Sequence, residues 1–225
     1  MNHESMVAVI DDDEPARRAL LRQLNCAGFR AVGFAGGIEF VNAAAHRDFD
    51  CVVADMYLPI MDGLQLQAEI KRISPDLSIV FITGHGDLSV GLAAMKQGAV
   101  DFLEKPLHED ALIEAVRRGA DLCRQRRAAQ ARRVQLEGRY ETLTRREREV
   151  FDLVAAGRLN KQAGADLGIT ERTIKVHRGR VMQKMGADSL ATLVRMAIIL
   201  EIRSLPHNPD APRPQLNALE LNNGR

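Results

Sequence analysis

Four short segments of this 225-residue sequence carry acidic, hydroxyl and basic side chains of the kinds used in phosphoryl transfer. Asp11-Asp12-Asp13 and Asp55 supply carboxylates, Thr83 supplies a hydroxyl, and Lys105 supplies an ammonium group. Crowded carboxylates repel one another unless a cation neutralises them, and hard oxygen ligands suit Mg²⁺. A carboxylate beside Mg²⁺ and a lysine can attack a phosphoryl group while the cations offset charge on its oxygens. A single aspartate after a strand is more often a helix cap. The phosphoryl-transfer hypothesis therefore depends on the spacing of the whole set.

Each of these segments follows a short apolar run bounded by turn signals. Such runs are typical of strands that are buried on both faces of a parallel sheet. Parallel strands bring their ligand sites together at their carboxyl ends, which predicts that the four segments converge. The runs are residues 7–10, 51–54, 79–82 and 100–103, with 31–34 as a weaker fifth candidate.

Amphipathic segments with helical spacing separate the runs. Alternating strands and helices predict a doubly wound α/β domain with a parallel five-stranded sheet. The apolar residues expected to face the sheet are Leu20, Leu21 and Leu24, then Leu64, Leu66, Ile70 and Ile73, then Leu88, Leu92 and Met95, and finally Leu112, Ile113, Val116, Ala120 and Cys123.

The segments VAVIDDDEP, VVADMYLPIMDG, FITGHGD and AVDFLEKP together resemble the receiver domain of two-component response regulators, over about residues 5–125. The resemblance implies that Asp55 is the phosphoacceptor. It also implies that Asp11 and Asp12 hold Mg²⁺ together with the Asp55 carboxylate and the backbone carbonyl of Tyr57. A tyrosine two residues after the acceptor departs from the smaller or more polar side chain often found there, which bears on the lifetime of the phosphoryl group.

The same resemblance assigns roles at the ends of the last two strands. Thr83 and Lys105 are expected to contact the phosphoryl oxygens, and the Lys105–Pro106 bond is expected to be cis. Phe102 occupies the aromatic switch position, which turns inward when Thr83 moves toward the phosphate.

Charge divides the chain into two halves. Residues 1–116 contain 9 Lys and Arg against 18 Asp and Glu, a net charge of −9, whereas residues 117–225 contain 22 against 12, a net charge of +10. A basic half suggests a polyanionic partner such as nucleic acid. The domains expected are a receiver at 1–125, an Arg-rich helical linker at 126–140 with a break at Gly138, an all-α domain at 141–203, and a proline-containing disordered tail at 204–225.

Residues 143–200 predict four helices. Thr144 and Glu147 form a capping box at the start of the first helix, which Gly157 ends. Asn160 is expected to cap a short second helix that ends near Leu167.

A turn at residues 168–170 leads into a third helix, which Thr170 caps and which runs to about Met185. A short helix, a Gly-containing turn and a capped basic helix describe a helix-turn-helix with its recognition helix. His177 has no second histidine or carboxylate at metal-ligand spacing, which favours a packing or phosphate role. Ile174, Val181, Met182 and Met185 should face inward, while Arg172, Thr173, Lys175, His177, Arg178 and Lys184 form the basic face.

The segments LTRREREV, GRLNKQAGADLGIT, RTIKVHRGRVMQKM and SLATLVRMA resemble the LuxR-type DNA-binding domain of FixJ- and NarL-like regulators. With TGHGD and VDFLEKP in the receiver, the order of domains is closest to FixJ. The resemblance implies base contacts from Lys175 and Val176, phosphate contacts near Thr173 and Lys184, and dimer pairing through residues 189–201. Arg172 and Arg178 complete the expected DNA-binding set.

Two glycines depart from the LuxR-type pattern. Ala163-Gly164 replaces a bulkier apolar residue followed by alanine, and a mid-helix glycine costs up to about 1 kcal/mol. Gly179 stands where a longer side chain often faces the DNA groove, so Arg178 is expected to contribute to sequence preference.

We expect a phosphorylation-controlled transcription factor and not an enzyme. Its expected partners are a sensor histidine kinase, promoter DNA, a second copy after phosphorylation, and RNA polymerase. Cys26, Cys51 and Cys123 form no C-x-x-C pair, and no apolar run reaches membrane-spanning length, which fits a cytoplasmic protein without a membrane segment.

Two alternatives come from other classes. A phosphatase of the haloacid dehalogenase type fits Asp11-x-Asp13, but Pro15 stands where that class has Thr or Val. A ligand-gated LuxR-type regulator should have an aromatic-rich pocket, whereas this chain has no Trp and 4% aromatic residues. Phosphate labelling distinguishes the three hypotheses.

Overall fold

The computed structural model describes residues 4–44, 47–84 and 88–200 and divides into two units on either side of the 131/132 boundary. That boundary falls inside the segment predicted as a linker. The tail at 204–225 and the predicted end of the second domain at 201–203 lie outside the described residues. Among the described residues, no helix is both long enough and apolar enough to cross a membrane.

The first unit contains the predicted parallel five-stranded sheet, in the order β2-β1-β3-β4-β5. Every residue of β3 and β4 is buried, as expected for apolar runs covered on both faces. This order places the carboxyl ends of β1 and β3 side by side. The strands are β1 (Met6–Ile10), β2 (Arg30–Phe34), β3 (Cys51–Asp55), β4 (Ser78–Thr83) and β5 (Asp101–Glu104).

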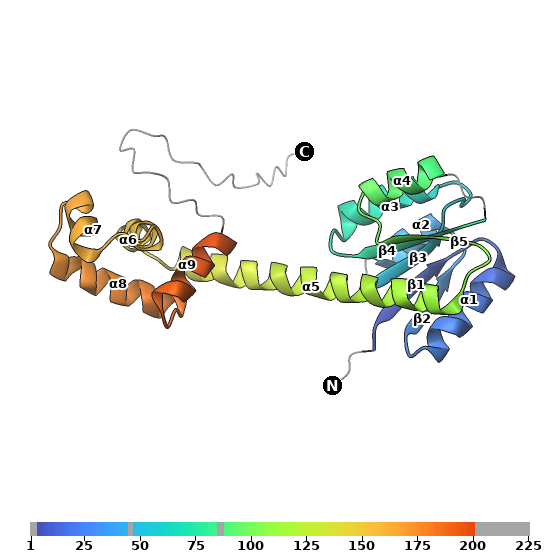
Figure 1. The fold of residues 1–225 in the computed structure, drawn as a ribbon, viewed down its shortest axis with the longest axis horizontal. Helices are drawn as coiled ribbons and strands as arrows, with labels where there is room; N and C mark the ends of the chain where they lie inside the picture. Colours follow the sequence, from blue (N-terminus) through green and yellow to red (C-terminus); the bar gives the residue numbers. More distant parts are fainter. Residues whose placement is uncertain (1–3, 45–46, 85–87, 201–225) are drawn as a thin grey trace, which may run out of the picture. The chain divides into compact units, whose positions relative to one another are not determined.

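Helices cover both faces of this sheet (Figure 1). Leu20 of α1 and Leu112 of α5 pack with Val53 on one face, and Phe40 of α2 and Leu66 of α3 lie in the core of the other. The doubly wound α/β fold is confirmed. The helices of this unit are α1 (Glu14–Cys26), α2 (Gly37–Ala44), α3 (Gly63–Ile73), α4 (Leu88–Lys96) and the first part of α5 (Glu109–Glu141).

The inward face of α4 was predicted wrongly. Leu92 and Met95 are 52% and 42% exposed, whereas Ala94 is fully buried. Gly91 lies against the ring of Phe102, to which an added Cβ would approach within 3.1 Å. Small residues let α4 lie close to the ring, and this close packing leaves its larger apolar side chains pointing outward. The side chain of Leu88 lies outside the described residues.

The predicted break at Gly138 is also wrong, because α5 continues for 33 residues to Glu141. A Cβ at Gly138 would meet open space, so no close contact requires the chain to turn there. The helix ends where the amides of Thr142 and Leu143 donate to the carbonyls of Arg139 and Tyr140, both at 3.1 Å.

The second unit contains α6 (Arg145–Ala155), α7 (Asn160–Leu167), α8 (Glu171–Met185) and α9 (Leu190–Ile199) around one core. The capping box of Thr144 and Glu147 is confirmed, as is the Thr170 cap of α8. Asn160 is not the cap of α7 but its first residue. Leu159 holds the cap position, where its amide donates to Oε1 of Gln162 at 3.0 Å.

Candidate functional site

The carboxyl ends of β1, β3 and β5 bring two aspartates and a lysine into direct contact. Asp11 follows β1, Asp55 ends β3, and Lys105 follows β5. Nζ of Lys105 lies 2.6 Å from Oδ2 of Asp55 and 3.1 Å from Oδ2 of Asp11. Thr83 ends β4 at the same edge, fully buried and in register with Glu104. The structure therefore brings together the residues that sequence spacing selected.

Backbone amides hold the second oxygen of each aspartate. The amide of Asp13 donates to Oδ1 of Asp11, and the amide of Tyr57 donates to Oδ1 of Asp55, both at 2.9 Å. Nη1 of Arg17 donates to the carbonyl of Asp11 at 2.6 Å, which fixes the turn after β1. Both carboxylates are thus held in one orientation, with one oxygen of each directed at Lys105.

One ammonium group faces two buried carboxylates at this edge, and burial is the main influence on the titration of Asp11. Burial raises the pKa of Asp11 above its ordinary value, although the hydrogen bonds from Lys105 and Asp13 oppose the rise. Burial lowers the pKa of Lys105, but its bonds to Asp55 and Asp11 outweigh burial and the net shift is upward. The lysine therefore stays charged, and the pocket retains an excess of negative charge.

The chemistry of these donors fits a hard divalent cation. The pocket offers carboxylate oxygens in excess of positive charge, and Mg²⁺ takes few protein ligands because it keeps several waters. The predicted ligand Asp12 is exposed, and the described residues contain no ready group of three acidic, histidine or cysteine side chains. In this orientation the Lys105 ammonium group donates hydrogen bonds to Oδ2 of Asp11 and Oδ2 of Asp55.

Two unusual backbone conformations follow the strands that carry Asp55 and Lys105. The Lys105–Pro106 peptide bond is cis, as predicted, and Phe102 lies half-buried on β5. Ile60, in the loop after Asp55, has φ 71° and is 90% exposed. This left-handed conformation is rare for a β-branched residue, and no residue pattern in the sequence predicts it.

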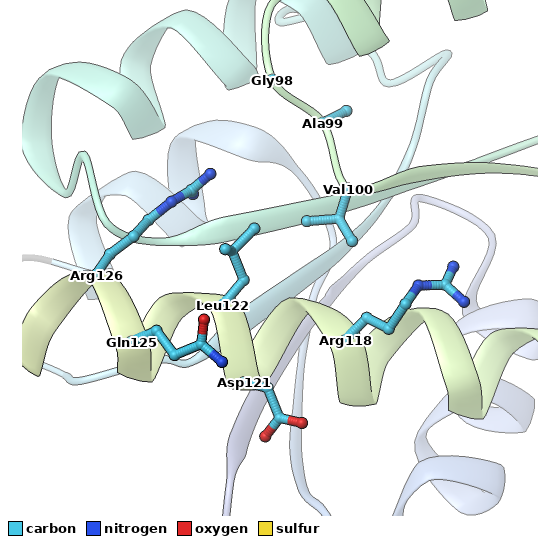
Figure 2. Close-up of a pocket in the computed structure, with 8 residues that line it drawn as sticks. All are labelled: Gly98, Ala99, Val100, Arg118, Asp121, Leu122, Gln125 and Arg126. Atoms are coloured by element: carbon cyan, nitrogen blue, oxygen red, sulfur yellow. The ribbon is translucent and has the colours of Figure 1, made fainter.

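A separate hollow of about 580 Å³ lies between α5 and the segment leading into β5 (Figure 2). Arg118 and Arg126 point into it from the helix, and Val100 faces them. Arg118 is already paired with Asp101 and Glu114. None of the aspartates of the acidic pocket lines this hollow, and it had no signal in the sequence.

The predicted DNA-binding residues lie on α8, mostly exposed. Arg172, Lys175 and Val176 are exposed, and Val176 is 50% accessible despite its apolar side chain. Lys175 forms an i,i+4 ion pair with Glu171 at 3.2 Å. Oγ1 of Thr173 shares a hydrogen bond with Oγ1 of Thr170 at 2.9 Å. The first two turns of α8 therefore present polar and apolar groups to solvent.

Glycines shape the turn that precedes this helix. Gly168 adopts φ 66° at the end of α7, a conformation that favours glycine. Gly164 lies so close to the turn that an added Cβ would be 2.8 Å from the carbonyl oxygen of Ile169. The departure at position 164 is therefore a packing requirement of this chain. Gly179 has open space around it, and nothing in the structure requires glycine there.

Two of the basic residues are engaged inside the domain. Nη1 of Arg178 donates to Oδ1 of Asn160 at 3.1 Å, which links α8 to α7. Nζ of Lys184 bonds to Oε2 of Glu147 at 2.6 Å and to the carbonyl of Thr142 at 3.0 Å. His177 is half-buried.

Each of the two units matches a known protein family. Residues 7–117 match the response regulator receiver domain, and residues 141–197 match the bacterial regulatory proteins of the luxR family. Nodulation protein W of Bradyrhizobium diazoefficiens is 42% identical over 199 residues, covering 88% of each chain. Response regulator protein TodT of Pseudomonas putida is 36% identical over 192 residues, covering 85% of each chain.

Two solved structures of response regulators match most of the chain. The structure of the response regulator StyR superposes with a TM-score of 0.73 at 41% sequence identity, covering 87% of this chain and 99% of StyR. Full-length FixJ from B. japonicum superposes with a TM-score of 0.56 at 36% identity, covering 90% of this chain and all of FixJ.

Proposed function

This chain belongs to the transcriptional response regulators that join a receiver to a luxR-family DNA-binding domain, and on that premise we propose that phosphorylation of Asp55 controls DNA binding. It is a DNA-binding regulator and not an enzyme, like the relatives it matches. The observation that carries the proposal is the Lys105 ammonium group, which contacts both Asp55 and Asp11 at the carboxyl edge of the sheet.

The phosphoryl donor is a sensor histidine kinase. A carboxylate oxygen of Asp55 attacks phosphorus, a P–O bond forms, and the P–N bond to the donor histidine breaks. The electron pair of that bond stays on the imidazole, which takes up a proton. Lys105 and the hydroxyl of Thr83 stabilise the transferred oxygens. The side chains that would hold Mg²⁺ are Asp11, Asp12 and Asp55, together with the backbone carbonyl of Tyr57. The cation would offset negative charge on the carboxylate and phosphoryl oxygens.

Phosphorylation then promotes formation of a homodimer. Movement of Thr83 toward the phosphoryl group gives Phe102 room to turn, and Phe102 lies directly under Gly91 of α4. The exposed side chains of Leu92 and Met95 are on that helix, so a change at Phe102 reshapes an apolar surface. A second copy is the proposed occupant of this surface.

The recognition helix α8 is proposed to lie in the major groove of promoter DNA. Lys175 and Val176 read base edges, and Arg172, Thr173 and Arg178 contact the backbone or neighbouring bases. The phosphate contact predicted for Lys184 remains a prediction. Two of the three N–H donors of Lys184 bond within the domain, which leaves one donor for a phosphate oxygen. Pairing through α9 brings two such helices to paired half-sites. RNA polymerase is the further partner proposed, and the cytoplasm, where promoter DNA is found, is the proposed location.

Labelling with acetyl phosphate and Mg²⁺ tests the acceptor. Wild-type protein should take up one phosphoryl group, and Asp55→Asn should take up none because the nucleophilic oxygen is lost. The exposed Asp48 provides a matched control, and Asp48→Asn should label like the wild type. Undiminished labelling of Asp55→Asn would remove Asp55 as the acceptor.

Titration of selected and scrambled DNA sites tests the groove assignment. Lys175→Ala should weaken binding to the selected site by about 1–3 kcal/mol and change scrambled-site affinity much less. The scrambled site is the internal control, because it retains the phosphate contacts. Equal losses on both sites would show that Lys175 does not read bases.

A further inference from the structure

The last two turns of α5 are part of the core of the DNA-binding unit. Leu136 is almost fully buried in that core. The ring of Tyr140 packs edge-on against Phe151 of α6, with ring centroids 5.4 Å apart. The guanidinium of Arg148 lies over the same Tyr140 ring, 5.3 Å from its centre. The end of α5 is therefore built into the unit that carries α8.

Two cations tie the end of α5 to the end of α8, one from each side. Nη1 of Arg139, on α5, donates to the carbonyl of Met185, the last residue of α8, at 2.9 Å. Nζ of Lys184, on α8, donates to the carbonyl of Thr142, directly after α5, at 3.0 Å. Carbonyls at a helix end have no partner within the helix, and a cation there is favoured by the helix dipole.

The fit around these bonds is close. An added Cβ at Gly186 would lie 2.8 Å from Nη1 of Arg139. Lys184 also bonds to Oε2 of the buried Glu147 at 2.6 Å, and Glu147 accepts a hydrogen bond from the amide of Thr144 at 2.9 Å. The segment joining α5 to α6 is therefore held to the last turn of α8 by a continuous set of bonds.

We propose that Arg139 and Lys184 are positioning residues that act as one clamp, holding the recognition helix to the end of α5 and so setting how α8 meets DNA. Both act on DNA recognition through the placement of α8 and not by touching DNA. The clamp gives Lys184 a role that differs from the predicted phosphate contact.

The clamp also gives the phosphorylation signal a route, a consequence that rests on the proposed function. Leu112 and Val116 of α5 are buried in the receiver core, while Leu136 of the same helix is buried in the second core. A change in the receiver that alters the end of α5 reaches α8 only through groups that join them, and the clamp supplies two such bonds.

A double-mutant cycle tests the clamp in the full-length protein. The DNA probe is a duplex that the wild-type protein selects from a random-sequence library. The variants are Arg139→Ala, Lys184→Ala and the double variant, with Arg132→Ala as the matched control, because Arg132 is exposed on the same helix. Dissociation constants are measured at several salt concentrations, with and without acetyl phosphate.

Each single variant should weaken binding about fivefold, equivalent to about 1 kcal/mol, because an opened clamp leaves α8 less firmly positioned. The double variant should bind no more weakly than the weaker single variant, because either change opens the same clamp. The salt dependence should equal that of the wild type, and Arg132→Ala should bind normally. Arg139→Lys should recover part of the loss, since a lysine can still donate to the carbonyl of Met185.

Additive losses in the double variant would overturn the clamp. A smaller salt dependence in Lys184→Ala would also overturn it, because a smaller salt dependence marks a lost phosphate contact. Circular dichroism checks folding, and if Lys184→Ala is unfolded, the pair Glu147→Gln with Lys184→Gln replaces it without leaving a buried charge. A wild-type protein whose DNA affinity ignores phosphorylation would sink the proposed function instead. The double-mutant cycle at a fixed phosphorylation state would still show whether Arg139 and Lys184 act together.

Discussion

Asp11 and Glu147 are buried carboxylates that each bond to a lysine, yet their surroundings move their pKa values in opposite directions. Asp11, at the carboxyl edge of the sheet, has a raised pKa because burial outweighs its bonds to Lys105 and the amide of Asp13. Glu147, at the start of α6, has a pKa of about 2 because Lys184 and Thr144 bond to it. The bond to lysine is 3.1 Å at Asp11 and 2.6 Å at Glu147.

Burial is the largest influence on the pKa of Asp11, whereas the hydrogen bond from Lys184 is the largest influence on the pKa of Glu147. Lys105 serves Asp11 and Asp55 together, whereas Lys184 serves Glu147 alone. The acidic pocket is therefore short of positive charge and suited to receive a cation and a phosphoryl group, while the Glu147 pair is neutral and holds helices together. Substitutions at the first region should stabilise the fold and impair chemistry, and substitutions at the second should destabilise it.

Glu147→Gln should have the largest effect on stability. A pKa of about 2 against an ordinary value of 4.5 corresponds to about 3 kcal/mol of stabilisation from the charged form. Because the folded-state pKa is the lower one, this stability is present above pH about 4.5 and is lost as the pH falls toward 2. Hydrogen exchange of the α6 and α8 amides at several pH values measures this stability. Equal pH profiles for the variant and the wild type would show that charged Glu147 does not stabilise the fold.

Gly164→Ala should come next, with a loss of about 2 kcal/mol. A mid-helix alanine normally gains up to about 1 kcal/mol over glycine, but here the Cβ would lie 2.8 Å from a backbone oxygen of the turn. Gly179→Ala is the matched control, since the same change meets open space and should gain stability. Thermal denaturation decides, and a gain at both positions would show that the turn yields easily.

Asp11→Asn should stabilise the receiver at neutral pH by about 1 kcal/mol. The raised pKa means that the charged form is disfavoured in the folded state, so stability falls as the pH rises through that pKa. An amide removes this cost, and the gain should vanish at low pH, where the carboxyl is protonated. Addition of Mg²⁺ should shrink the gain by stabilising the wild type. A loss of stability at pH 7 would contradict a burial cost for the charged carboxylate of Asp11.

Ile60→Gly should give the smallest gain, about 0.5 kcal/mol, because glycine adopts φ 71° without strain but loses more backbone entropy on folding. Ile38 is also an exposed isoleucine of this unit but lies in α2, so Ile38→Gly should lose stability. Denaturant titration of both variants measures the difference. Similar losses at the two positions would show that the loop after Asp55 is not strained.

Sequence spacing was sufficient for the acidic pocket because parallel strands place their last residues at one edge. Asp11, Asp55, Thr83 and Lys105 each follow or end a strand, so correct strands alone bring them together. Ile60 was missed because its backbone angle has no signature in its residue type. The face of α4 was misjudged because Gly91 and Ala94, and not the larger Leu92 and Met95, pack inward.

The DNA-binding unit was less predictable in its anchoring than in its helices. The capping residues Thr144 and Thr170 marked helix starts correctly, since their side chains bond to nearby amides in the sequence. The hydrogen bonds of Lys184 were not visible in the sequence, because its partners Thr142 and Glu147 are 42 and 37 residues away. Long-range bonds of this kind depend on how helices pack, which local patterns do not specify.

DNA binding by the wild type and by Asp55→Asn, each with and without acetyl phosphate and Mg²⁺, tests the central claim most directly. The probe is a duplex selected by the phosphorylated wild-type protein. Phosphorylation should tighten wild-type binding about tenfold or more, equivalent to about 1.4 kcal/mol, and leave Asp55→Asn unchanged. An equal response in Asp55→Asn, or none in fully phosphorylated wild type, would contradict control of DNA binding through Asp55.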